Sequence, residues 1–305
     1  MKSINLSRLG RLFSLVMAIG GTFASVSPGL AAPKKLLVVT VTKGFRHSSI
    51  PTAEKVLGEL AQKSGAFTVE YARVEPKDAE FRRDDGKPDE EKVDAAIRKV
   101  LAEKMSSEAL KNYDGVMFAN TTGDLPLPDK QAFLDWIKSG KGFIATHSSS
   151  DTFHGFPPYI EMLGGEFETH KEQAEVDCIN QDPAHPACRH LGSTWHLKDE
   201  IYLIKNFDRS KVHGLLMLDK HPNYKTPGDF PIAWTKEYGK GRVFYTSLGH
   251  REDVWDPNTP ENFKRENPKT VSEAYQQHIL GGIKWALGLE GNMIKRPREV
   301  KNSSE

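Results

Sequence analysis

The chain has almost no excess charge of either sign. It contains 42 Lys and Arg residues against 41 Asp and Glu residues among its 305 residues, and its formal net charge is +1. A nucleic-acid-binding domain usually carries a basic patch or a run of Lys and Arg, because phosphate contacts supply much of its affinity. We therefore expect no nucleic-acid partner. A composition of 38% hydrophobic and 27% charged residues is typical of a globular protein and excludes a mainly disordered chain.

Several motifs that define common enzyme chemistries are also missing. There is no G-x-x-x-x-G-K-[ST] loop, and no G-x-G-x-x-G follows the first predicted strand, so nothing supports the binding of a nucleotide phosphate. The H-E-x-x-H pattern of zinc proteases and the G-x-S-x-G turn of serine hydrolases are absent as well. Any catalytic site must be built from another set of residues.

The first 31 residues have the pattern of a secretory signal peptide. Lys2, Arg8 and Arg11 precede an apolar stretch, and small residues lead to a cleavage site after Ala31. The apolar stretch is too short and too rich in glycine for a good membrane-spanning helix. The alternative to a cleaved signal peptide is an uncleaved membrane anchor. We expect a protein that is periplasmic or secreted, with no stable membrane insertion once the segment is removed.

The sequence has only two cysteines, Cys178 and Cys188. Because export leads to an oxidising compartment, we predict a disulfide between them that closes a short loop. The alternatives are two free buried thiols, or a zinc site with His185 and His190, although the spacing matches no usual zinc motif.

Apolar runs and helical patterns alternate in the first half of the chain. Strand patterns and helical patterns follow one another in this order, which is typical of a doubly wound parallel sheet. The expected elements are a strand at 35–41, a helix from Ser49 to Gly65, a strand at 67–73, a charged insertion at 75–95 that ends in a helix, a strand at 113–119, a helix around Phe133 to Ile137, and a strand at 142–146.

The second half changes to a strand-rich pattern that ends in a helix. Strands are expected at 174–179, 196–204, 213–219, 230–237 and 241–248, and the helix at 272–286. No repeat or linker divides the chain, so we predict one domain over 32–290 and a flexible basic tail over 291–305. The fold class is α/β, with a mostly parallel sheet and a β-rich C-terminal extension.

Polar side chains follow four of the predicted strands. In an open α/β sheet the carboxyl ends of the parallel strands meet at one edge, where ligands bind. Each residue alone could cap a helix or make a turn, but three histidines at one edge are not needed for that. Imidazole suits proton transfer near neutral pH and metal binding. The residues are Arg46, His47, Ser48, Asn120, Thr121, His147, Ser148, Asp151 and His250, and His170 could reach the same edge.

Long motifs in the same regions resemble the ThuA-like, or trehalose-utilisation, family. They include T-K-G-F-R-H-S-S-I-P at 42–51, G-F-I-A-T-H-S-S-S-D-T-F at 142–153, D-P-A-H-P at 182–186 and the segment from Pro231 to His250. The resemblance covers about residues 35–288. It implies a flavodoxin-like fold related to class I glutamine amidotransferases. Those relatives carry a nucleophilic cysteine after a central strand, where this chain has Thr146-His147-Ser148, so the resemblance does not extend to amidotransferase chemistry by a thiolate.

The family is tied to disaccharide catabolism, which implies a carbohydrate ligand and favours an enzyme that acts on glycosides or keto-sugars. We expect His147 to be a general base or metal ligand, Asp151 to orient it or share the metal, and His47 to assist. The sequence defines no cofactor, and a divalent metal ion is the candidate. The substrate-binding candidates are Arg46, Asn120, Thr121, Ser148, His170 and His250, and the metal-ligand candidates are His47, His147, Asp151, His170 and His250.

Two other functions stay open at this point. A non-catalytic sugar-binding protein would use the same edge for recognition, and a structural domain would use it to meet another protein. A homo-oligomer is possible. A usual glycosidase needs two carboxylates that flank the scissile bond, and few acidic residues can be placed at this edge, which favours metal-assisted chemistry or proton abstraction beside a carbonyl.

Overall fold

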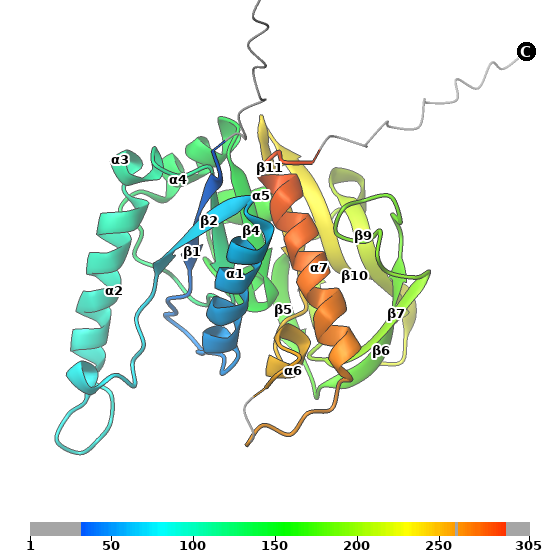
Figure 1. The fold of residues 1–305 in the computed structure, drawn as a ribbon, viewed down its shortest axis with the longest axis horizontal. Helices are drawn as coiled ribbons and strands as arrows, with labels where there is room; N and C mark the ends of the chain where they lie inside the picture. The colour runs from blue at the N-terminus through cyan, green and yellow to red at the C-terminus, as the bar shows by residue number, and fades with distance from the viewer. Residues whose placement is uncertain (1–31, 260–261, 291–305) are drawn as a thin grey trace, which may run out of the picture. The chain divides into compact units, whose positions relative to one another are not determined.

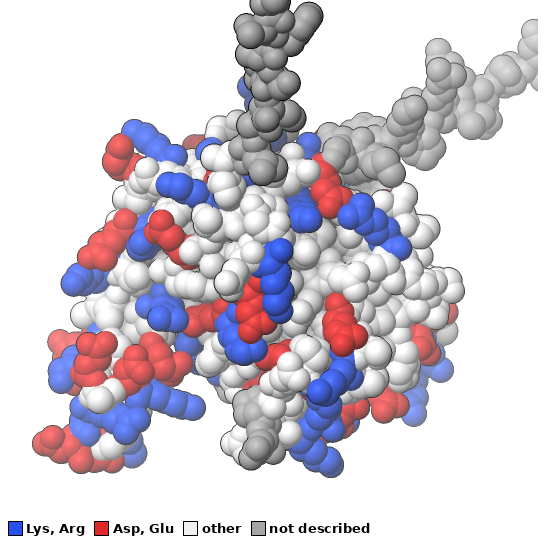
Figure 2. Space-filling model, viewed as in Figure 1, with Lys and Arg blue, Asp and Glu red and all other residues white. Residues whose placement is uncertain are grey.

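The computed structural model describes residues 32–259 and 262–290 (Figure 1). The predicted signal peptide at 1–31 and the predicted tail at 291–305 lie outside these residues. No described helix combines the length and the apolar character that crossing a membrane requires. On the face seen in Figure 2, basic and acidic side chains are interspersed rather than gathered by sign.

A nine-stranded sheet organises the described chain, with the strand order β2-β1-β3-β4-β11-β10-β9-β6-β7. Its first five strands in that order are parallel to one another, and the other four continue the sheet in antiparallel pairs. The strands are β1 (Lys34–Val39), β2 (Phe67–Ala72), β3 (Gly115–Ala119), β4 (Gly142–Thr146), β6 (Ala174–Asn180), β7 (Thr194–Asp199), β9 (His213–Lys220), β10 (Pro227–Tyr238) and β11 (Gly241–Thr246).

The inner parallel strands β1, β3 and β4 are buried on both faces, which is why their sequences read as mostly apolar runs, whereas the edge strand β2 alternates between buried and exposed residues. In β1, Leu36 and Val38 join one apolar cluster while Leu37 and Val39 join the other. The helices α1 (Ile50–Ser64) and α7 (Lys269–Ala286) contribute to the first cluster and lie on the face of the sheet that Figure 1 shows in front. The second cluster receives side chains from α2 (Glu90–Met105), α4 (Lys130–Lys138) and α5 (Pro157–Leu163).

The predicted fold class is confirmed: a mostly parallel α/β sheet with antiparallel strands added toward the C-terminus. Short elements complete the fold. They are α3 (Ser107–Leu110), α6 (Glu252–Trp255) and the 3-10 turns η1 (Ala79–Phe81), η2 (His147–Asp151) and η3 (Arg209–Lys211).

The strand predicted at 196–204 is wrong. The chain leaves the main sheet after Asp199, passes through Glu200 and Ile201, and then enters β8 (Tyr202–Lys205). This strand pairs with β5 (Glu166–His170) in a separate two-stranded sheet. The break places Glu200 between two strands, where its side chain is free to point into the site described below.

The predicted disulfide is also wrong, because Cys178 and Cys188 are both free thiols. The two residues are fully buried in the first apolar cluster. Cys178 lies in β6 opposite Trp195, and the Cys188 Sγ atom lies 4.0 Å from the carbonyl oxygen of Leu215. Burial raises the pKa of the Cys188 thiol to about 12, so this thiol stays protonated and unreactive at neutral pH.

Candidate active site with a metal-binding geometry

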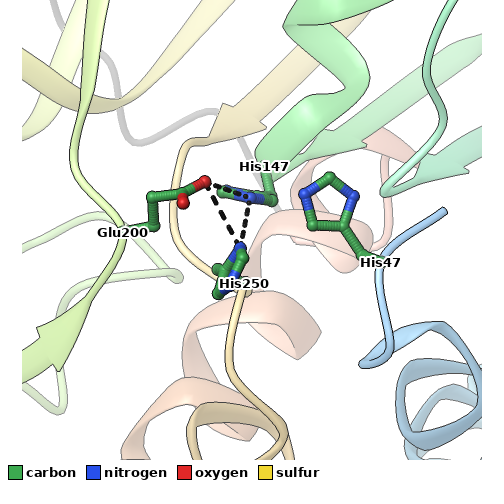
Figure 3. Close-up of side chains that lie close together, drawn as sticks. All are labelled: His47, His147, Glu200 and His250. Atoms are coloured by element: carbon green, nitrogen blue, oxygen red, sulfur yellow. Dashed lines mark hydrogen bonds and ion pairs between the residues drawn. The ribbon is translucent and has the colours of Figure 1, made fainter. Parts of the chain in front are cut away.

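Three histidines and one glutamate come together beyond the carboxyl ends of the strands. They are His47, His147, Glu200 and His250, and each offers a ligand atom within 4.8 Å of all the others (Figure 3). His147 directly follows β4, His47 lies in the loop after β1, and His250 lies in the loop after β11. The structure therefore brings together the three histidines that the strand-end pattern selected.

His147 is held in one orientation by the main chain of β11. Its Nδ1 atom lies 2.8 Å from the carbonyl oxygen of Ser247. Because a carbonyl oxygen can only accept, Nδ1 donates to it, and the neutral form of the ring therefore has its lone pair on Nε2. The Nε2 atom faces the cluster and lies 2.8 Å from the Tyr202 hydroxyl oxygen. The residue has a φ of 46°, in the left-handed region, and such outliers are common where a side chain must be aimed at a site.

Glu200 supplies the negative charge of the cluster. Its Oε2 atom lies 3.5 Å from His147 Nε2 and 3.3 Å from His250 Nδ1. Burial alone would raise the pKa of Glu200, but the hydrogen bonds and charges of His147 and His250 outweigh it and hold the pKa well below its usual range. The Glu200 carboxylate is therefore ionised at neutral pH. For His250, burial favours a lower pKa, but the neighbouring Glu200 and Asp199 carboxylates outweigh it and raise the pKa.

Asp199 fixes the position of Glu200 relative to the loop that carries His250. It is completely buried, and its carboxylate accepts from the backbone N–H of Gly249 at 2.7 Å and of Arg251 at 3.2 Å. These two bonds hold the backbone on both sides of His250, while Glu200 is the next residue along the chain. In the sheet, β7 is an edge strand and lies four places from β11. Its last residue, Asp199, nevertheless contacts the loop that follows β11.

His47 completes the cluster from the opposite side. Its ring lies edge-on to His147 and His250, with centroid distances of 4.8 and 5.2 Å, and its Nδ1 atom lies 3.2 Å from Ser148 Oγ. Burial, together with the neighbouring His147 and His250, lowers the pKa of His47 to about 2. The ring is therefore neutral at physiological pH, which is the form of imidazole that binds metals.

The predicted residues Asn120 and Thr121 lie under the cluster and are completely buried. The Asn120 amide donates to the carbonyl oxygen of Gly249 at 2.8 Å and to Ser49 Oγ at 3.1 Å. Thr121 Oγ1 lies 2.8 Å from Thr152 Oγ1. These contacts brace the loops that carry the histidines, and they correct the expectation that Asn120 and Thr121 bind the substrate.

Arg46 points away from the cluster although it precedes His47. Its guanidinium donates to the carbonyl oxygen of Thr40 at 2.8 Å and to Glu75 at 3.0 Å. It borders a separate open groove of about 650 Å³, whose lining includes no member of the cluster. The expected role of Arg46 at the shared edge is therefore wrong.

A smaller pocket of about 240 Å³ opens onto the cluster. Three predicted residues, Ser148, Asp151 and His170, line it without belonging to the cluster. Asp151 lines the pocket but pairs with His154 rather than with His147, and His170 Nδ1 lies 3.0 Å from Glu200 Oε1. The lining residues are Phe45, His47, Thr122, Ser148, Asp151, Phe167, His170, Glu200, Tyr202 and His250.

The sequence patterns did not identify Glu200, and they favoured a core position for Tyr202. The acidic pair Asp199-Glu200 interrupts an otherwise strand-like stretch, and that interruption was the available signal. Reading 196–204 as one strand concealed it.

The chemistry of the cluster fits a divalent metal ion. A neutral imidazole with a fixed lone pair, two further imidazoles and an ionised carboxylate are ligands that zinc and other transition metals accept. The His147 Nε2 atom has Tyr202 Oη, His250 Nδ1 and Glu200 Oε2 within 3.5 Å. The hydrogen bond from His147 Nδ1 to the carbonyl oxygen of Ser247 is of the kind that orients metal-bound histidines.

Comparisons with known proteins agree with this architecture. The family model described as "ThuA: Trehalose utilisation" matches residues 35–286. A search of the curated proteins found no match. A putative ThuA-like protein from Parabacteroides merdae is similar in structure, with a TM-score of 0.59 at 19% identity, covering 87% of this chain and 94% of that one. A putative ThuA-like protein from Bacteroides uniformis gives a TM-score of 0.56 at 16% identity, with coverages of 86% and 94%. At these identities the two structures show a shared fold.

Proposed function

We propose that this chain, which belongs to the ThuA or trehalose-utilisation family, is an enzyme that acts on a sugar with the help of a divalent metal ion. The observation that carries the proposal is the cluster of His47, His147, Glu200 and His250, with ligand atoms within 4.8 Å of one another. His47, Glu200 and His250 line a pocket, so a ligand that enters the pocket reaches the cluster.

The substrate class follows from the family and from the shortage of carboxylates. The family is linked to trehalose utilisation, which supports a glycoside or a keto-sugar derivative of one as substrate. Two acidic residues line the pocket, and Glu200 is engaged by His147, His170 and His250. A retaining or inverting glycosidase uses two carboxylates on opposite sides of one bond. Proton abstraction next to a keto group needs only a Lewis acid and a single base. We therefore favour a keto-sugar over an unmodified glycoside as the substrate.

Each residue has a distinct part in this proposal. His147, His250, Glu200 and His47 would hold the metal ion, which would polarise a carbonyl or hydroxyl oxygen of the sugar. Asp151, on the pocket wall, accepts a proton from the substrate, and His154 orients its carboxylate. Asp199 positions Glu200 and His250. The basic N-terminal pattern supports export, so the enzyme would meet its substrate in the periplasm or outside the cell.

Removal and replacement of metal ions tests this function. Purified protein is treated with a chelator, dialysed, and assayed for product from glycosides and keto-glycosides, before and after zinc, manganese or cobalt is added. We expect turnover of a keto-glycoside to fall at least tenfold on chelation and to return with one of the metals. Sugar binding without any product under all conditions would instead identify a binding protein, and turnover unaffected by chelation would exclude the metal.

A further inference from the structure

Phe45 is a large apolar side chain that the fold leaves in solvent. Its side chain is 70% exposed, whereas the other large exposed hydrophobic residues in the described ranges, Tyr224 and Leu289, reach 38% and 39%. It lies at the pocket that opens onto the histidine–glutamate cluster, and its ring meets His47 edge-on at a centroid distance of 4.9 Å. A single exposed apolar residue is common on a protein surface, but Phe45 also lines the pocket, where its ring can contact a ligand.

The loop that carries Phe45 is fixed to the loop after β3. Lys43 N donates to the carbonyl oxygen of Thr122 at 2.9 Å, Gly44 N donates to Thr122 Oγ1 at 3.2 Å, and that hydroxyl donates to the carbonyl oxygen of Phe45 at 2.8 Å. The two loops touch closely, since a Cβ atom on Gly123 would lie 2.8 Å from Gly44 N. The backbone that carries Phe45 is therefore held in place before any ligand arrives, which lowers the entropy cost of binding.

The pocket below Phe45 has polar and apolar walls. The rings of Phe167 and Tyr202 pack against each other with a centroid distance of 4.5 Å and form the apolar wall. Asp151, His170 and Glu200 provide the charged or polar atoms. Its volume of about 240 Å³ falls below the range of roughly 300–1,000 Å³ typical of drug-sized ligands. A space this small suits one sugar ring, whose C–H faces are apolar and whose edge carries hydroxyl groups.

We propose that Phe45 determines specificity for disaccharides: the pocket takes the reacting ring, and the exposed aromatic ring of Phe45 stacks on the second ring outside it. The inference rests on the proposed function, because it assumes a sugar in the pocket. Aromatic rings offer a flat, rigid apolar surface at little conformational cost. Phe45 thus selects a two-ring ligand over a single ring without touching the reacting atoms.

Calorimetric titration of the purified protein with trehalose and with glucose tests the proposal. Phe45→Ala is compared with the wild type, with Phe45→Tyr, which keeps the aromatic surface, and with Leu289→Ala. Leu289 is an exposed apolar residue that follows α7 and is absent from the pocket lining. We expect Phe45→Ala to bind trehalose about tenfold more weakly, a change of about 1.4 kcal/mol, and glucose within twofold of the wild type. Phe45→Tyr and Leu289→Ala should bind both sugars as the wild type does.

The proposal is overturned if Phe45→Ala leaves trehalose binding unchanged, or if it weakens glucose and trehalose by the same factor. The same titrations separate this inference from the proposed function. A selective loss of trehalose affinity would support the role of Phe45 even if chelation left turnover unaffected. Binding of neither sugar by the wild type would remove the basis of both.

Discussion

His147→Ala is expected to lower kcat/KM for a keto-glycoside by about a thousandfold or more and to remove most of the metal-binding capacity. His147 Nε2 is the atom on which Tyr202, His250 and Glu200 converge, so no other residue can take its place. Loss of Lewis-acid catalysis is worth several kcal/mol, and each 1.36 kcal/mol corresponds to a factor of ten in rate. Steady-state kinetics and elemental analysis of the same preparation measure both effects.

The controls for this variant address folding and histidine content. His147 has a φ of 46°, in the left-handed region. Asparagine tolerates this region, so His147→Asn removes the imidazole with little backbone strain. We expect His147→Ala and His147→Asn to lose activity and to keep the circular dichroism of the wild type. His190→Ala removes a histidine whose Nε2 atom bonds the carbonyl oxygen of Ala274 at 2.8 Å, outside the cluster, and should remain active. Undiminished turnover in folded His147→Ala would show that the catalytic centre has been assigned to the wrong residues.

Glu200→Gln is expected to weaken metal binding by at least about a hundredfold while leaving the fold intact. The change keeps the size of the side chain but removes the negative charge that faces His147 and His250. Residues that only hydrogen-bond to a metal ligand typically change metal affinity about 10- to 100-fold when they are mutated, and a direct ligand should have a larger effect. In the metal-free protein the pKa of His250 should fall, because Glu200 is one of the groups that raise it.

Calorimetric titration with zinc measures the affinity of Glu200→Gln, and the imidazole signals in an NMR titration report the pKa of His250. Glu168→Gln is the matched control, since Glu168 lies in β5 and is exposed. Equal zinc affinity in Glu200→Gln and the wild type would remove Glu200 from the ligand set. A pKa of His250 that stays raised in this variant would mean that Asp199 and Glu252 maintain it without Glu200.

The central part of the fold could be predicted from local patterns. The strands β1, β3 and β4 are buried on both faces, so their apolar runs carry the information, and Ser49, Pro51 and Gly65 mark the ends of α1. The convergence of His47, His147 and His250 followed from the rule that parallel strands end at one edge. These inferences needed no knowledge of distant contacts.

Other parts of the site depend on contacts that no local pattern encodes. Glu200 reaches the cluster because β7 returns to the loop after β11, where Asp199 accepts from Gly249 and Arg251. Arg46 and His47 are neighbours in sequence, yet their side chains leave the loop in different directions, one toward Glu75 and one toward His147. The pairing of Cys178 and Cys188 was inferred from the expected compartment, whereas packing places each thiol separately in the core.

The metal content of the purified wild-type protein tests the central claim most directly. The protein is purified without chelator, dialysed and measured by elemental analysis, with His147→Ala prepared in parallel. We predict close to one equivalent of a divalent transition metal per wild-type chain and far less in His147→Ala. A wild-type protein that holds no metal, even after incubation with zinc, manganese and cobalt, would contradict the assignment of His47, His147, Glu200 and His250 as a metal site.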